Sequence, residues 1–141
     1  MTTVEQILAI KGPDVIVADP ADTVREASRL MSEAKVGSVI VREEGKVVGI
    51  FTERDLLRRV VARGKDPSSV AVAEVMSSPV EHCRLEDDIV RCAKRLADGH
   101  IRHLAVIEEG VLVGLIGLRD ILLLQVHEAG KLAAEARAQC P

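Results

Sequence analysis

Apolar and polar residues follow one another in a pattern that predicts short strands separated by amphipathic helices. Apolar residues between Val24 and Ala34 recur every three or four positions, as in a helix that covers a core with one face. Largely apolar runs flank Glu43-Glu44-Gly45, a sequence that favours the turn of a hairpin. The expected elements of the first half are a helix at 3–9, strands at 15–17, 38–41 and 46–51, and helices that begin at residues 22 and 52.

The pattern of residues 14–57 returns in residues 79–122, displaced by 65 positions without a gap. Gly49 corresponds to Gly114, and most of the other pairs are apolar in both copies. A unit this short does not bury its own apolar face, so we expect the two copies to pack on each other. The order strand-helix-strand-strand-helix, present twice, indicates the α/β class.

The repeat divides the chain into four expected parts. Gly64 ends the last helix of the first copy, and a polar stretch with proline and serine follows. The parts are residues 1–64, the first repeat with its leading helix; 65–70, a linker; 71–128, the second repeat; and 129–141, a helical tail.

Composition narrows the range of functions. With 48% apolar and 29% charged residues, the chain of 141 residues is typical of a globular protein. Phe51 is the single aromatic residue and the net charge is −3, so a nucleic-acid platform built on stacking or on a basic surface is not expected. Three cysteines without a CxxC pair are typical of reduced thiols in a cytoplasmic protein. No signal peptide or membrane-spanning run is evident.

Each copy ends in the same motif, Gly-apolar-apolar-x-x-x-Asp, at residues 49–55 and 114–120. Further matches are Pro20-Ala-Asp-Thr-Val24, Val75-Met-Ser-Ser-Pro79 and Arg102-His-Leu104. With these motifs in register, the chain resembles a tandem pair of cystathionine β-synthase (CBS) domains over about residues 3–128, without an attached catalytic domain or transporter.

The resemblance implies two copies packed as a pseudo-twofold pair with two clefts between them. CBS pairs typically bind adenine nucleotides there (AMP, ADP or ATP), and S-adenosylmethionine or NAD are alternatives. They are regulatory modules that report a ligand by changing shape, and they usually form dimers. We therefore expect a ligand sensor that signals to another protein, not an enzyme, and no obligatory cofactor. A ligand-free interaction scaffold is the alternative.

The shared motif offers the chemistry that a nucleotide needs. An ionised aspartate can accept both hydrogen bonds of a ribose diol, and the start of a helix favours phosphate. Asp55 follows Arg54, and Asp120 follows Arg119, so each copy offers an acceptor beside a cation. The first expected site contains Thr52, Arg54 and Asp55, and the resemblance adds residues near Glu81, namely His82 and Cys83.

The second expected site differs from the first. Gly117 replaces Thr52, so a hydroxyl is missing, whereas Arg102 and His103 replace Gly37 and Ser38. We expect this site to be richer in cations. Its residues are Arg102, His103, Arg119 and Asp120, with Ile16 and Val17 added from the first copy by the resemblance.

Structural roles compete with these interpretations. Thr52 and Asp55 also fit a helix capping box, a role that explains Asp120 less well because Gly117 has no hydroxyl. Arg102 and His103 could instead be solvated or paired with acidic residues at 108 and 109. No pair of histidines and cysteines has metal-ligand spacing on a common helix face, so we expect no metal site.

The last helix differs from its counterpart in a way that predicts an interface. Leu123 and Leu124 stand where the first copy has Arg58 and Arg59, which we expect to be a solvated face. An apolar surface wider than one stripe marks an interaction face, so we expect a homodimer through these helices. Alternatively, the tail at 129–141 folds back over the leucines.

Overall fold

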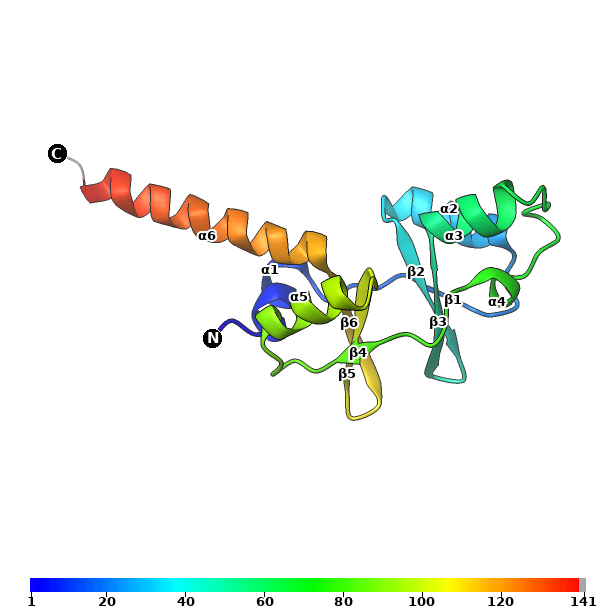
Figure 1. Ribbon diagram of the computed structural model, residues 1–141, viewed down its shortest axis with the longest axis horizontal. Helices are drawn as coiled ribbons and strands as arrows, with labels where there is room; N and C mark the ends of the chain where they lie inside the picture. Colours follow the sequence, from blue (N-terminus) through cyan, green and yellow to red (C-terminus); the bar gives the residue numbers. More distant parts are fainter. Residues whose placement is uncertain (140–141) are drawn as a thin grey trace. The chain divides into compact units, whose positions relative to one another are not determined.

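The computed structural model describes residues 1–139 and divides into two compact units, each a three-stranded sheet with helices (Figure 1). Unit 1 contains residues 1–13, 82–108 and the chain from 113 onward, and unit 2 contains residues 14–81 and 109–112. The predicted α/β class with two repeats is confirmed. The last two residues of the predicted tail, Cys140 and Pro141, lie outside the described residues.

Unit 2 is built on the first copy of the repeat. Its sheet has the order β1-β2-β3, with β1 parallel to β2 and β2 antiparallel to β3. Phe51 and Val39, paired across the hairpin, are fully buried in its core. The elements are β1 Val17–Ala18, α2 Val24–Ala34, β2 Ser38–Glu43, β3 Lys46–Thr52, α3 Glu53–Asp55 with its π-helical continuation Leu56–Val61, and α4 Val72–Val75.

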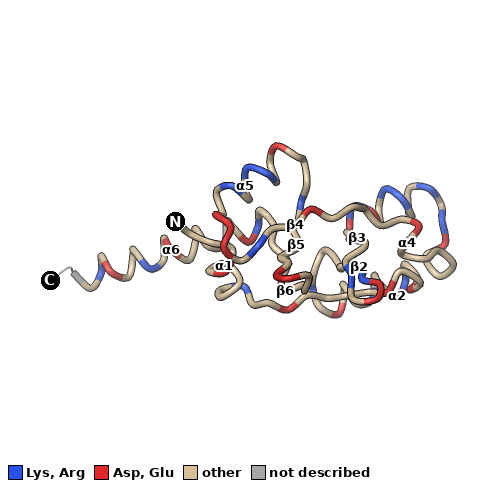
Figure 2. Tube along the Cα trace, turned by 90° about the horizontal axis from the view of Figure 1, so that it is seen from below, with Lys and Arg blue, Asp and Glu red and all other residues tan. Residues whose placement is uncertain are grey.

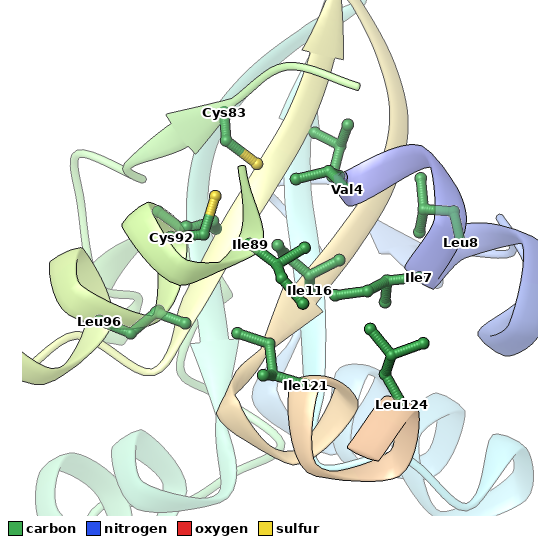
Figure 3. Close-up of a cluster of buried hydrophobic side chains, with 12 residues drawn as sticks. Val4, Ile7, Leu8, Cys83, Ile89, Cys92, Leu96, Ile116, Ile121 and Leu124 are labelled. Carbon is green, nitrogen blue, oxygen red and sulfur yellow. The ribbon is translucent and has the colours of Figure 1, made fainter. Parts of the chain in front are cut away.

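Unit 1 repeats this arrangement with the second copy. Its sheet has the order β4-β5-β6, and one end of its core is filled by sulfur-containing side chains (Figure 3). The long last helix begins immediately after the sheet. The elements are α1 Val4–Lys11, β4 His82–Cys83, α5 Ile89–Asp98, β5 His103–Glu108, β6 Val111–Gly117 and α6 Leu118–Gln139.

The leading helices are exchanged between the copies. Helix α1 precedes the first copy along the chain, but Val4, Ile7 and Leu8 are buried in the core of unit 1, and the Val4 N–H donates to the Asp87 carbonyl at 3.0 Å. Helix α4 precedes the second copy but lies in unit 2. The sequence predicts one part at residues 1–64. In the structure this stretch is divided, because residues 1–13 belong to unit 1 and the rest belongs to unit 2.

The glycines at matching positions of the two copies, Gly49 and Gly114, are explained by this exchange. A Cβ at Gly114 would lie 2.7 Å from a side-chain carbon of Leu8 in α1, and one at Gly49 would lie 2.9 Å from Cγ of Met76, just after α4. Real Cβ atoms do not approach other carbons so closely. Both glycines therefore allow a leading segment to pack against the sheet, rather than only serving strand geometry.

Two details of helix packing differ from the sequence prediction. In a helix that begins at residue 52, the sequence predicts that Leu57 and Val61 face inward with Leu56 and Val60. They are instead 60% and 59% exposed, because this segment is π-helical and the Ala62 N–H donates to Leu57 O, five residues back. Leu124, expected at a dimer interface together with Leu123, is 5% exposed and belongs to the core of unit 1. The interface prediction is therefore wrong for Leu124.

Charged residues do not concentrate by sign. Figure 2 shows acidic and basic residues interspersed along the chain. Among residues 1–139, no helix is both long enough and apolar enough to cross a membrane.

Candidate functional site

In unit 2, Asp55 belongs to a complete capping box at the start of α3. Its Oδ2 accepts hydrogen bonds from the backbone N–H and the hydroxyl of Thr52, both at 3.1 Å. In return, the Asp55 N–H donates to Thr52 Oγ1 at 3.2 Å. This reciprocal pairing satisfies donors that the first helical turn would otherwise leave without partners. The structure therefore shows the helix-capping role that competes with ligand binding in the interpretation of Thr52 and Asp55.

The other oxygen of Asp55 is used as well. The Ser77 hydroxyl donates to Oδ1 at 2.9 Å, and Arg59 Nε lies 3.7 Å from the same atom. Arg59 also donates to the carbonyl of Met76 at 2.9 Å. Arg58 and Arg59 are both exposed, as predicted for a solvated face, and Arg59 makes these contacts within unit 2 as well. Asp55 is 5% exposed, and both of its oxygens serve the fold of unit 2.

In unit 1, Asp120 occupies the corresponding turn with different partners. Its Oδ2 accepts from the Gly117 N–H at 2.8 Å and from the Lys11 ammonium at 2.9 Å. Lys11 also donates to the Leu115 carbonyl. Its Oδ1 accepts no hydrogen bond within the described chain, and the carboxylate is partly exposed. Oδ1 of Asp120 can therefore accept a hydrogen bond from a further donor.

Sequence reasoning missed Lys11 because it lies in the leading helix, outside the repeated motif. By the repeat spacing its counterpart is Met76, so no copy-to-copy match signals it. The sequence also missed Ser77, which lies inside the Val75–Pro79 match but carries no signal for contact with Asp55.

Gly117 is required by close packing. A Cβ at this position would lie 2.8 Å from the Arg102 carbonyl oxygen, too close for any side chain without a backbone shift. Unit 1 therefore keeps only half of the capping box, the bond from the Gly117 N–H to the Asp120 carboxylate.

His103 begins β5 close to these charges. Burial lowers the pKa of His103 below its ordinary value of 6.5, and the Lys11 cation lowers it further; Asp120 opposes this and Arg102 adds a smaller lowering. The neutral imidazole is therefore favoured at pH 7, so His103 contributes hydrogen bonding rather than positive charge. The cations that act on His103 are Lys11 and Arg102.

The alternative in which Arg102 or His103 pairs with Glu108 is not observed, because other residues occupy this carboxylate. Glu108 Oε2 lies 3.6 Å from the guanidinium of Arg84, and Oε1 accepts from the Leu85 N–H at 2.7 Å. Arg102 is exposed, one residue before β5 begins.

The remaining predicted residues are divided between the units. Arg54 and Arg119 are exposed, each one position before its aspartate. Ile16 and Val17 are half-buried at the start of the unit 2 sheet, where Ile16 O accepts from the Ile40 N–H at 2.9 Å. His82 is exposed on β4. Each predicted site thus draws residues from both units, and within a unit the structure brings together Thr52 with Asp55 and His103 with Asp120.

Cys83 differs from the other predicted ligand contacts because it is 2% exposed, in the core of unit 1. Burial raises the pKa of its thiol to about 12, and neighbouring Cys92 adds to the shift. Burial likewise raises the pKa of Cys92. The two sulfurs and a carboxylate oxygen of Asp87 lie within 4.8 Å of one another. Cys83 and Cys92 lack ligand spacing on a common helix face, which is why no metal site is expected from the sequence, but the fold brings them together with Asp87 from a strand, a helix and a turn.

Comparison with known proteins identifies relatives over almost the whole chain. The family model of the CBS domain matches residues 4–62 and again 72–127. An uncharacterized protein from Methanopyrus kandleri is 34% identical over 126 residues, which are 88% of this chain and 64% of that protein. This chain thus spans just under two thirds of that relative's length.

Solved structures share the fold. A proposed signal-transduction protein with CBS domains from Burkholderia ambifaria MC40-6 is 31% identical, with a TM-score of 0.81 over 86% of this chain and 91% of that one. The CBS domain pair of protein MJ0100, in complex with 5′-methylthioadenosine and S-adenosyl-L-methionine, is 22% identical, with a TM-score of 0.80 over 91% of this chain and 98% of that one.

Proposed function

The chain belongs to the CBS domain family as a tandem pair, a regulatory module, and we propose that it senses an adenosine-containing ligand. The ligand class is an adenine nucleotide such as AMP, ADP or ATP, with S-adenosylmethionine and NAD as alternatives. Binding would change the shape of the module and so signal to a regulated protein. A cytoplasmic location and a non-catalytic role are parts of the same proposal.

The observation that favours this proposal is the unequal use of the two aspartates. Asp55 has hydrogen bonds to both oxygens, whereas Asp120 has an oxygen to spare and is partly exposed. A ribose diol presents two donors, and bonds to an ionised acceptor are the strong ones. Lys11, 2.9 Å from Asp120, would place a cation near the phosphate of a bound nucleotide. We therefore assign Asp120 as the ribose acceptor and Lys11 as an added phosphate contact.

Support also comes from the relative that holds two adenosyl compounds, although that likeness concerns the fold. The proposed contacts from Ile16, Val17, His82, Arg102 and Arg119 rest on the family resemblance. Arg54, Thr52 and Asp55 remain a proposed second site, one that needs a ligand able to compete with the capping box.

Thermal unfolding with a panel of AMP, ADP, ATP, NAD and S-adenosylmethionine tests the proposal. A ligand that binds only the folded chain stabilises it by about 2.7 kcal/mol at 100 times its Kd. We expect at least one of these compounds to raise Tm, and no shift with any of them at millimolar concentration would reject the proposal.

Calorimetry on Asp120→Asn then tests the assigned acceptor. The amide oxygen can still accept from the Gly117 N–H, so the turn should persist while the charge is lost. We expect affinity for the ribose-containing ligand to fall about 10- to 100-fold, and affinity for adenine to change little. Asp98→Asn, an exposed change at the end of α5, is the matched control. Equal losses for both ligands would mean that Asp120 is structural.

An interaction scaffold is the second candidate, favoured by the surface of α6. Leu122, Leu123 and Val126 are 59%, 47% and 69% exposed, which is unusual for apolar residues on one helix. We propose that a second copy of the chain covers them in a homodimer. Sedimentation equilibrium of Leu122→Ser should show a weaker dimer, and a dimer that persists without any nucleotide-induced shift in Tm would select the scaffold.

A further inference from the structure

We propose that Cys83, Asp87 and Cys92 bind a thiophilic divalent cation of the Zn²⁺ type within unit 1. Cys83 ends β4, Asp87 lies in the following turn, and Cys92 lies in the first half of α5. This site is separate from the aspartates of the proposed nucleotide sites.

The geometry is close to that of a metal site. The two sulfurs point toward one another in the close-up of the core (Figure 3), and all three ligand atoms lie within 4.8 Å of one another. With Zn–S bonds of about 2.3 Å and Zn–O bonds of about 2.0–2.2 Å, a tetrahedral ion needs ligand atoms roughly 3.5–3.8 Å apart. Side-chain rotations that close the cluster by about 1 Å would therefore suffice.

The first copy of the repeat serves as an internal control for these positions. At the same spacing, unit 2 has Ala18 in place of Cys83 and Ala27 in place of Cys92, and both alanines are buried. The fold therefore needs only a small apolar side chain at each position. The two sulfurs in unit 1 are an addition to that requirement, and they are added as a facing pair.

Asp87 stabilises a turn through one carboxylate oxygen, and its other oxygen is left for a metal ion. Its Oδ2 accepts from the Arg84 N–H at 2.9 Å, as Asp22 Oδ2 accepts from the Asp19 N–H at 2.9 Å in the other unit. The turn thus accounts for one carboxylate oxygen in both copies. Only in unit 1 does the same carboxylate face two thiols.

The surroundings allow a cation to enter and to be balanced in charge. A surface hollow lined by Asp87, Cys92, Met1 and Arg91 among others borders the cluster, so a cation can enter past the partly exposed Asp87 and keep a water molecule as its fourth ligand. Two thiolates and a carboxylate around Zn²⁺ carry one net negative charge. Arg95, whose Nη1 donates to the His82 carbonyl at 2.9 Å, is placed to offset that charge. On binding, the two thiol protons pass to solvent and two Zn–S bonds form.

Titration of the full-length chain with Co²⁺ under a reducing agent tests the site. We expect one ion per chain, with the visible bands of tetrahedral Co²⁺ and a near-ultraviolet thiolate charge-transfer band, both removed by Zn²⁺. Zn²⁺ should also raise Tm, because the cluster exists only in the folded chain. Cys140→Ser is the matched control and should bind as the wild type does.

The decisive variant is Cys83→Ala with Cys92→Ala, which installs the residues that unit 2 already folds with. It should retain the wild-type circular dichroism and lose both the Co²⁺ bands and the Zn²⁺-induced rise in Tm. Asp87→Asn keeps an acceptor for the Arg84 N–H and should weaken Zn²⁺ binding at least about 10-fold.

Three results would overturn the site. One is a wild-type chain that shows no tetrahedral Co²⁺ spectrum with reduced thiols. Another is a double-alanine variant that binds as the wild type does. The third is a purified chain whose mass is lower by two hydrogens and returns under reductant without gaining metal affinity, which would identify the pair as a disulfide.

Discussion

Asp55 and Asp120 occupy the same position of the same repeated turn, yet their carboxylates have different hydrogen-bond partners. In unit 2 the carboxylate is enclosed, with hydrogen bonds to both oxygens, whereas in unit 1 an oxygen is left over and a lysine from the leading helix is paired with the other. The shared motif, in register in two copies, can therefore have both carboxylate oxygens engaged in one copy and only one engaged in the other.

The difference has its origin in residues far from the motif. Ser77 and Arg59 serve Oδ1 of Asp55, and their counterparts in the repeat are Gly12 and Leu124, which cannot donate from a side chain. Leu124 instead fills the core of unit 1. Leucine in place of Arg59 thus removes one possible partner of Asp120, and because Leu124 is buried it does not contribute to the predicted dimer surface.

The largest expected change in stability comes from replacing each aspartate with alanine. Asp55→Ala removes the carboxylate of the capping box, leaves the Ser77 hydroxyl without its acceptor and removes the ion-pair partner of Arg59, so we expect it to lower the free energy of unfolding by about 2–4 kcal/mol. Asp120→Ala breaks one backbone bond and one partly exposed ion pair, and we expect a loss of about 1 kcal/mol. Urea unfolding followed by circular dichroism measures both.

Ser77→Ala is the control that shows how much of the Asp55→Ala destabilisation comes from the hydrogen bond between Ser77 and Asp55. It removes one donor and should cost about 1 kcal/mol. If Asp55→Ala and Asp120→Ala prove equally costly, the two turns are energetically equivalent and the unequal hydrogen bonding has no consequence for stability.

A smaller effect is expected at the residue before each of these helices. Gly117→Ala places a Cβ 2.8 Å from the Arg102 carbonyl, and the resulting backbone shift should cost about 1–3 kcal/mol. Thr52→Ala loses a cap but creates no clash, and should cost about 1 kcal/mol. The same urea experiment compares them, and a neutral Gly117→Ala would show that the loop at Arg102 yields easily.

Local features of the fold could be predicted from sequence because they depend on neighbours. The spacing of Thr23 and Glu26 predicts a capping box, and the structure shows it, since both partners lie within one turn. The apolar periodicity after Asp88 predicts a helix from Ile89 to Asp98 that Gly99 ends, and α5 has these bounds. Periodicity shows which face of a segment is apolar, but it does not show which sheet that face covers.

Features that depend on long-range packing could not be predicted in this way. Nothing in residues 4–11 indicates that α1 joins the second copy, so the contact between Lys11 and Asp120, 109 positions apart, was invisible. The meeting of Cys83 with Cys92 across a strand and a helix was invisible for the same reason. The π-helical turn shifted the exposed face at Leu57, because its hydrogen bonds span five residues instead of four.

The smallest expected effect concerns pH, and it arises from a further difference between the copies. Unit 2 has buried Ser38 where unit 1 has His103, whose pKa is lowered first by burial and then by Lys11. Below 6.5 the unfolded chain binds a proton that the folded chain does not, so stability contributed by neutral His103 is present at higher pH and declines as the pH falls through that range.

His103→Ser, which installs the residue of unit 2, should therefore flatten the dependence of stability on pH between about pH 7.5 and about pH 5.5. His100→Ser, at an exposed position three residues earlier, should leave that dependence unchanged. Lys11→Met removes a cation and leaves Asp120 less neutralised, and both changes favour the imidazolium. The histidine NMR titration of this variant should therefore move His103 to higher pH. A shift to lower pH would show that Lys11 does not act on His103 through its charge.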